Sequence, residues 1–167
     1  SGLITRPIYM RCGLYSEKTA SKINPDGAIV QLKADGTYRE FVVDDEGNVT
    51  ALSRSGIDYE YPIHFQIMSS WPAGHYFGEL TVLDEDGNLM NRMEGNGLLN
   101  ANEVPHERVV LDLWDYVTPQ EYDLVRQKKK CSIPYNKRLE TLQTIIDNAP
   151  TDRIKMIETH RVSSIKE

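Results

Sequence analysis

The sequence predicts an α+β domain of mostly antiparallel sheets with flanking helices. Two observations support this class. Turn-forming residues at 45–48 and 84–88 join runs of β-forming residues, which indicates hairpins. Later in the chain, apolar residues at 134–148 recur at three- and four-residue spacing, which indicates an amphipathic helix between strands. Hairpins first and helices between later strands are typical of α+β folds.

The elements follow one another in a definite order. We expect strands at 28–33, 38–43, 49–53, 76–83, 108–116 and 153–162, and helices at 62–71 and 134–148. Pro72 stops the first helix. The strand at 108–116 is rich in β-formers and is expected to be buried. Residues 91–102 contain Gly95-Asn96-Gly97, and we expect a functional or mobile loop there.

Length and composition narrow the class of protein. A chain of 167 residues with 40% hydrophobic residues is large enough for a single domain with its own core, spanning 1–167. No apolar run approaches the ~20 residues of a membrane helix, so no membrane partner is expected. Two unpatterned cysteines favour a reducing, cytoplasmic location. The net charge of −6 argues against a nucleic-acid surface spread over the whole domain, but it allows a local basic stripe.

Lys33 is the candidate nucleophile. It ends a predicted strand in Gln31-Leu32-Lys33-Ala34-Asp35-Gly36. Lysine is a poor nucleophile at neutral pH unless desolvation or a nearby cation lowers its pKa. Arg54, in Ser53-Arg54-Ser55-Gly56, returns across a predicted hairpin and could supply that cation and bind a phosphate. Each motif alone also fits a solvated turn, and the pair is more specific than either member.

Three further residues complete the candidate site. Glu79 lies in an apolar strand within Gly78-Glu79-Leu80, where a carboxylate would need a hydroxyl, a cation or a metal; a solvent-facing edge strand is the alternative. Trp114, within Leu113-Trp114-Asp115-Tyr116, is either a core residue or a platform on which a base stacks. Gln31 points to the same side as Lys33 under strand alternation, and its amide could read the edge of a base.

Taken in order, these four motifs resemble the adenylation (nucleotidyltransferase) domain of ATP-dependent DNA ligases, and the T-even phage kind in particular. Pro134-Tyr135-Asn136-Lys137-Arg138-Leu139 resembles the segment that opens a helix after the tryptophan strand in that family. The resemblance runs from about residue 7 to the end of the sequence. It implies an ATP-grasp-like fold of this domain in a phage-infected or bacterial cytoplasm.

The resemblance also implies a chemistry. Lys33 would attack the α-phosphate of ATP, release pyrophosphate and carry AMP, which the complete enzyme uses to seal nicks in duplex DNA. Gln31, Arg54, Glu79 and Trp114 would bind the nucleotide, and Glu79 would also support Mg²⁺. We expect a monomer whose partners are ATP and nicked duplex DNA.

The sequence departs from the family at several points. Tyr38 stands where many ligases have an arginine, and Arg39 one place later should face the other side of its strand. Phe77 replaces a common aspartate. The sequence ends before the motifs that carry a metal-supporting glutamate and two phosphate-gripping lysines, and before the oligonucleotide-binding barrel. We therefore expect the isolated chain to be inactive or nearly so.

Two other functions fit the same residues. One is an RNA ligase or a capping-type guanylyltransferase, which uses the same lysine chemistry on another substrate. The other is a non-catalytic fragment that binds nucleotide or DNA. A basic cluster at Arg126, Lys128, Lys129 and Lys130 could touch a DNA backbone, although a solvated loop or helix end explains it as well.

Overall fold

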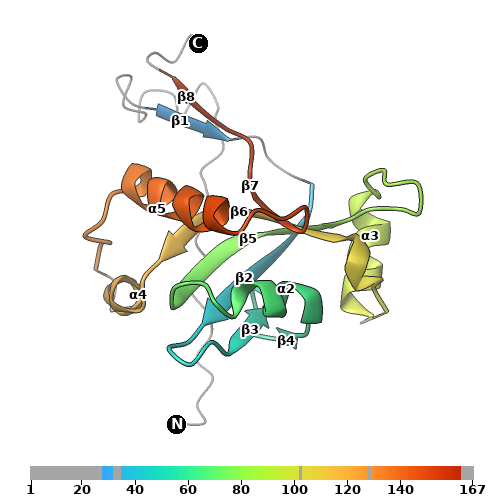
Figure 1. Cartoon of the computed structure of the whole chain (residues 1–167), viewed down its shortest axis with the longest axis horizontal. Coiled ribbons are helices and arrows are strands. Elements are labelled where there is room, and N and C mark those ends of the chain that lie inside the picture. The colour runs from blue at the N-terminus through green and yellow to red at the C-terminus, as the bar shows by residue number, and fades with distance from the viewer. Residues whose placement is uncertain (1–27, 32–34, 102, 128, 163–167) are drawn as a thin grey trace.

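The computed structural model describes residues 28–31, 35–101, 103–127 and 129–162, and the fold is α+β (Figure 1). The strands are β1 Ala28–Gln31, β2 Thr37–Val43, β3 Val49–Leu52, β4 Asp58–Tyr59, β5 Gly74–Val82, β6 Val109–Val117, β7 Ile154–Met156 and β8 Thr159–Val162. The helices are α2 Pro62–Met68, α3 Arg92–Asn100, α4 Pro119–Arg126 and α5 Tyr135–Asn148, with a 3₁₀ turn at His106–Arg108.

Six strands form the main sheet in the order β4-β3-β2-β5-β6-β7. All neighbours pair antiparallel except β6 and β7, which run parallel after the α5 crossover. The predicted turn between β2 and β3 forms because Asp44 accepts hydrogen bonds from the backbone N–H of Glu46 and Asn48. Gly47 supplies the positive φ of 83° that this turn requires.

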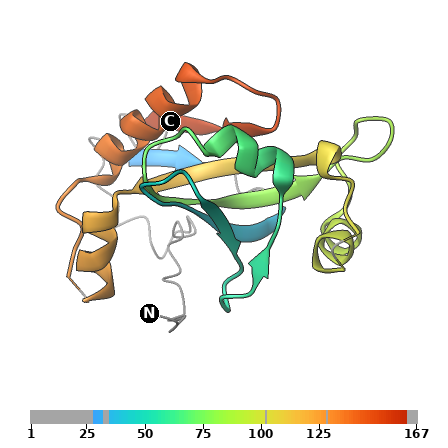
Figure 2. The same ribbon diagram turned by 60° about the horizontal axis from the view of Figure 1, so that its bottom comes forward.

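The two faces of the main sheet are packed differently. Helices α2 and α5 lie on the same face, as Figure 2 shows, and their apolar stripes bury Met68 and Leu142 against Phe41 and Leu111 in the larger core. The opposite face carries a smaller cluster, formed by Tyr38, Phe77, Trp114, Val117, Tyr122 and Ile157. We call this second side the cluster face.

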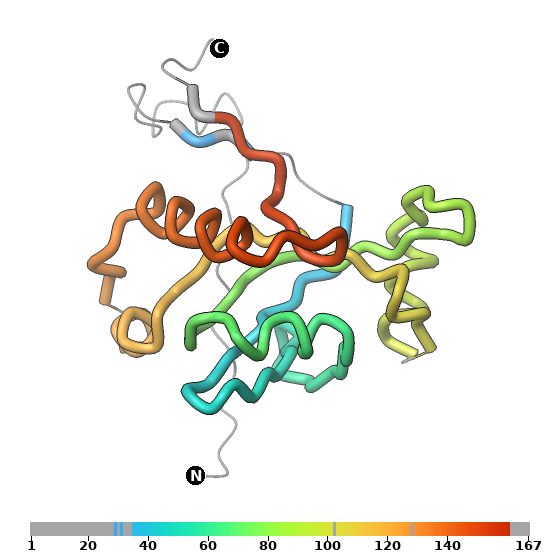
Figure 3. The backbone as a smooth tube through the Cα atoms, in the orientation of Figure 1, coloured from blue at the N-terminus to red at the C-terminus, as the bar shows by residue number. Residues whose placement is uncertain are grey.

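A second, two-stranded sheet pairs the first strand with the last. β1 and β8 run antiparallel, with Gln31 opposite Thr159. The backbone tube in Figure 3 shows these two segments lying side by side beyond α5, although they are far apart in sequence. The chain passes between the small sheet and the main sheet at one end of this pair, where the end of β1 lies opposite the start of β8. In sequence, β2 follows β1, and residues 157–158 link β7 to β8.

Two sequence predictions were wrong. Residues 91–102 were expected to be a loop, but most of them form helix α3. The side chain of Asn91 accepts a hydrogen bond from the N–H of Glu94, which caps the helix, and Gly95 faces Val82 on β5. The predicted final strand at 153–162 is two strands, β7 and β8, in different sheets.

Helix α4 had no counterpart in the sequence prediction. The hydroxyl of Thr118 accepts from the N–H of Glu121, and Pro119 occupies the first turn, so the segment carries an ordinary helix start. Within the described ranges, no helix has the length and apolar character needed to cross a membrane.

Candidate functional site

Three of the sequence motifs meet where β2 begins. Thr37 and Tyr38 pair with Leu80 and Glu79 on β5. Leu52, the last residue of β3, pairs with Glu40 on β2, so the segment after β3 that contains Arg54 returns to the start of β2. The hairpin predicted between the lysine and arginine motifs is therefore present.

The glycines of two motifs allow this close approach. A Cβ atom on Gly36 would lie 2.7 Å from the carbonyl oxygen of Leu80. One on Gly78 would lie 2.4 Å from the carbonyl oxygen of Asp112. Real Cβ atoms do not come this close to backbone, so both positions require glycine. At Gly78 the pairing of β5 with β6 also shifts register.

Glu79 lies in the middle of the sheet, which rules out the edge-strand alternative. It belongs to one row of paired residues that crosses four strands: Tyr38, Glu79, Asp112 and Lys155. Burial raises the pKa of the Asp112 carboxyl, and Lys155 opposes that effect. Asp112 and Lys155 were missed by the sequence prediction. The strand Val109–Val117, in which two aspartates interrupt apolar residues, was the available signal for Asp112.

Arg54 is exposed in a tight turn. The N–H of Ser53 donates to the carbonyl of Ile57 (2.9 Å), and the Ser53 hydroxyl accepts from the N–H of Ile57 (3.0 Å). Gly56 supplies a φ of 90°. The turn therefore holds Arg54 on a short loop, closed by its own hydrogen bonds, at the edge of the candidate site.

Trp114 is buried, with 7% of its surface exposed, and its ring centroid lies 6.0 Å from that of Tyr38. Both belong to the cluster face, on the same side of the sheet as Glu79. Gln31 ends β1 and is half-buried, with its Nε2 donating to the Thr159 hydroxyl at 3.3 Å. Trp114 and Gln31 thus come from different sheets.

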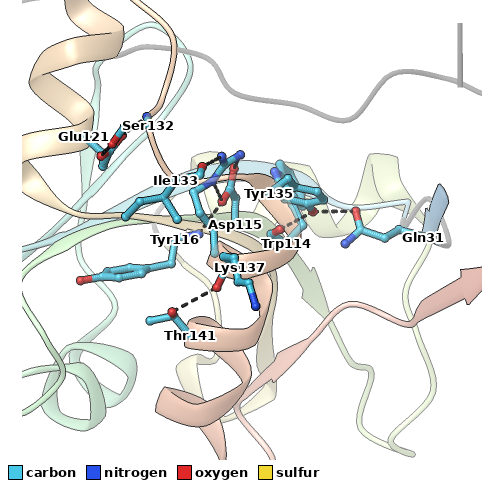
Figure 4. Close-up of polar contacts among 11 residues, drawn as sticks. Gln31, Trp114, Asp115, Tyr116, Glu121, Ser132, Ile133, Tyr135, Lys137 and Thr141 are labelled. Carbon is cyan, nitrogen blue, oxygen red and sulfur yellow. Dashed lines mark hydrogen bonds and ion pairs between the residues drawn. The ribbon is translucent and has the colours of Figure 1, made fainter. Parts of the chain in front are cut away.

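Tyr135, at the start of α5, joins these two residues. Its hydroxyl lies 2.5 Å from the carbonyl oxygen of Trp114 and 3.1 Å from Oε1 of Gln31, as drawn in Figure 4. Sequence reasoning singled out the 134–139 segment but gave Tyr135 no role.

Arg138 anchors the same turn of α5. Its Nε and Nη2 donate to the two carboxylate oxygens of Asp115 at 2.9 and 3.1 Å, and its Nη1 donates to the carbonyl of Ile133 at 2.7 Å. Burial raises the pKa of Asp115, and the Arg138 hydrogen bonds offset part of that rise. A bidentate, largely buried pair of this kind fixes the helix start against β6.

Lys33 lies outside the described residues, as does Lys128 of the basic cluster. Arg126 ends α4, and Lys129 and Lys130 are exposed beyond it, which agrees with the helix-end alternative. In the part of the chain that the structure describes, no group of three or more His, Cys, Asp or Glu could hold a metal ion by itself.

The two family departures have clear structural consequences. Tyr38 packs on Trp114, and Arg39 faces the other side of the sheet, as strand alternation predicted. Arg39 is buried under Tyr59, whose ring centroid lies 4.1 Å from the guanidinium carbon, and donates to the hydroxyl of Tyr61. Phe77 is fully buried in the cluster face.

Solved structures of DNA ligases share this architecture. The ATP-dependent DNA ligase of bacteriophage T7, in complex with ATP, superposes with a TM-score of 0.67 over 91% of this chain at 15% identity. A Pmar ligase gives 0.68 over 98% at 13% identity. The chain has a DNA ligase fold. The mycobacterial DNA ligase D, complexed with ATP and MES, gives 0.51 over 80% at 22% identity.

The similarity to these ligases is one of fold. No protein-family model and no curated protein sequence matches the chain. The chain spans 55% of the T7 ligase and 37% of the Pmar ligase. The fold of these ligases is thus shared by a sequence that is only 13–22% identical to theirs.

Proposed function

We propose that this chain is the adenylation domain of an ATP-dependent DNA ligase of the phage type. The observation that carries the proposal is the meeting of the motifs at the start of β2, within a ligase fold. The segment following Lys33, the turn that carries Arg54 and the Glu79 strand converge on one edge of the cluster face. In the complete enzyme, this domain would prepare AMP for the sealing of nicked duplex DNA.

Lys33 is the proposed nucleophile. Its neutral amine would attack the α-phosphorus of ATP, forming a P–N bond as the bond to the bridging oxygen breaks, with pyrophosphate leaving and the amine losing a proton. Such a transfer depends on positioning and on neutralising phosphate charge. Arg54 provides a fork donor at the edge of the site for that charge.

Glu79 and Asp112 are the residues that would hold Mg²⁺. They are paired neighbours on β5 and β6, and Mg²⁺ in nucleotide sites commonly takes one or two carboxylates together with substrate phosphates. Burial raises the pKa of the Asp112 carboxyl because it destabilises the charged form, and a cation bound beside Asp112 would stabilise that form. Mg²⁺, when bound, would offset phosphate charge. Lys155 on β7, which pairs with Asp112 on β6, adds a positive charge to the same row.

Gln31 and Trp114 would bind the base. Trp114 offers an aromatic surface on the cluster face, where base stacking contributes ~1–3 kcal/mol. The Gln31 amide both donates and accepts, as the edge of adenine requires.

Intact-mass spectrometry after incubation with ATP and Mg²⁺ tests the proposal. The experiment uses this chain and the full product of the gene that encodes it. We expect an added AMP on the full product, abolished in Lys33→Ala, while the chain alone reacts slowly or not at all. Arg126→Ala, in the basic cluster, is the matched control and should leave the adduct intact.

The alternatives predict different results. A GMP adduct formed from GTP in preference to AMP would indicate a capping-type enzyme. Nucleotide binding without any adduct on the full product would overturn the catalytic role of Lys33 and leave a binding module. An adenylated enzyme that seals nicked RNA but not nicked DNA would indicate an RNA ligase.

A further inference from the structure

The hydroxyl of Tyr135 contacts one residue from each sheet. It lies 2.5 Å from the Trp114 carbonyl oxygen in the main sheet and 3.1 Å from Oε1 of Gln31 in the small sheet. Both contacted atoms are acceptors, and a tyrosine hydroxyl has one proton to donate. Tyr135 therefore shares a single donor between the two residues that the sequence assigns to the base.

The other end of the Gln31 amide is held as well. Its Nε2 donates to the Thr159 hydroxyl at 3.3 Å, and that hydroxyl donates its own proton to the carbonyl of Ile157 at 2.8 Å. Because the Thr159 proton is engaged there, the Thr159 oxygen acts as an acceptor toward Gln31. The nitrogen end of the amide thus faces Thr159, and the oxygen end faces Tyr135.

Tyr135 is itself rigidly placed. Its ring lies under the Arg138 guanidinium, whose carbon is 5.1 Å from the ring centroid, and Arg138 is fixed by its bidentate pair with Asp115. Asp115 directly follows Trp114 on β6 and also accepts from the N–H of Tyr116 (2.8 Å). Among the contacts in Figure 4, those that join Trp114 and Asp115 to Tyr135 and Gln31 therefore form one connected group from β6 through α5 to β1.

We infer that Tyr135 is a positioning residue that sets base specificity: by holding the Gln31 amide in one orientation beside Trp114, it makes the site prefer adenine to guanine nucleotides. The inference rests on the proposed function. Adenine presents a donor at N6 where guanine presents an acceptor at O6. An amide locked in one orientation matches only one of these patterns, whereas an amide that can rotate matches either.

The test is the ratio of the Kd for GTP to the Kd for ATP, measured by tryptophan fluorescence titration of the whole chain. In Tyr135→Phe we expect this ratio to fall roughly three- to tenfold, the effect of one hydrogen bond. Tyr76→Phe is the matched control, because Tyr76 is a buried tyrosine whose hydroxyl also donates to a backbone carbonyl, that of Pro72 at 2.7 Å. Tyr76→Phe should lower the free energy of unfolding by a comparable amount and leave the ratio of the two Kd values unchanged.

A double-mutant cycle shows whether Tyr135 acts through Gln31. In a Gln31→Met background, Tyr135→Phe should no longer change the ratio. Thr159→Val releases the nitrogen end of the Gln31 amide and should lower the Kd ratio by a similar factor. If Tyr135→Phe does not fold, Thr159→Val takes its place as the test.

Each outcome decides the inference. An ATP preference that survives both Tyr135→Phe and Thr159→Val overturns the role of Tyr135 and leaves the proposed function standing. A wild-type chain that binds ATP and GTP equally overturns it too. A wild-type chain that binds neither nucleotide overturns this inference, and the proposed function falls with it if the full product of the gene also binds neither.

Discussion

At the scale of single residues, the buried His64 makes the stability of the fold depend on pH. It is fully buried on α2, with Nε2 3.0 Å from the carbonyl oxygen of Val109. Burial lowers its pKa to about 4, an effect that the Val109 hydrogen bond only partly opposes. The folded protein therefore keeps His64 neutral in a pH range where the unfolded chain protonates it.

The sign of the pH effect follows from this difference. Above pH ~6.5 both states hold a neutral imidazole, and the stability is fully present. Between about pH 6.5 and 4 only the unfolded state gains the proton, so we expect a loss of about 2 kcal/mol at pH 5 that approaches 3 kcal/mol near pH 4. Urea unfolding at pH 7.5 and pH 5 measures it. His64→Gln, which keeps a donor but does not titrate, should show a smaller loss, and an equal loss in both proteins would contradict the assignment.

At the scale of elements, Gly36 determines how closely β2 can approach β5. Gly36→Ala would place a Cβ against the Leu80 carbonyl, and we expect a loss of about 1–3 kcal/mol in the free energy of unfolding. Gly97→Ala is the matched control: Gly97 lies in α3 with nothing within 4 Å of its Cβ position, so the change should stabilise the helix by up to ~1 kcal/mol. Equal effects of the two changes in denaturant titrations would count against close approach as the reason for this glycine.

The elements also show what could and could not be predicted. Strands β2, β3, β5 and β6 and helix α5 were predicted well, because local turn chemistry and apolar periodicity specify them. Helix α3 was missed because two glycines and several asparagines have low helix propensity, which the Asn91 cap and the packing on Val82 outweigh. The break between β7 and β8 depends on which sheet each strand joins, and periodicity carries no such information.

In the candidate site, too, local features were predicted and long-range ones were not. Glu79 and Arg54 were located from short motifs, and the hairpin that relates them is a local feature. Asp112, Lys155 and Tyr135 were missed because strand register and the packing of a distant helix bring them to the site. Gln31 was predicted to read the edge of a base with its amide, and nothing in the sequence indicated that Tyr135 and Thr159 contact the two ends of that amide. Lys33 stays a prediction.

At the scale of the whole molecule, we expect the main sheet to be stable without the small sheet. Among the β1 and β8 residues whose side chains the structure describes, none belongs to the larger core. Ending the chain at 158 removes β8, and we expect the main sheet still to unfold cooperatively. ATP affinity should fall roughly tenfold or more, because Gln31 loses Thr159 and β1 loses its pairing. A chain ending at 162 keeps β8 and is the control; equal ATP affinity of the two chains would contradict the expectation.

The pairing of the first strand with the last has a consequence for biosynthesis. Gln31 leaves the ribosome long before Thr159, its partner 128 residues later. The main sheet can begin to form from β2, β3 and β5 while synthesis continues, since these strands are neighbours in sequence and in space. The position of Gln31 is fixed only when β8 has emerged. The proposed base pocket can therefore be assembled only after β8 has been synthesised, and a nascent chain would have no nucleotide selectivity before that point.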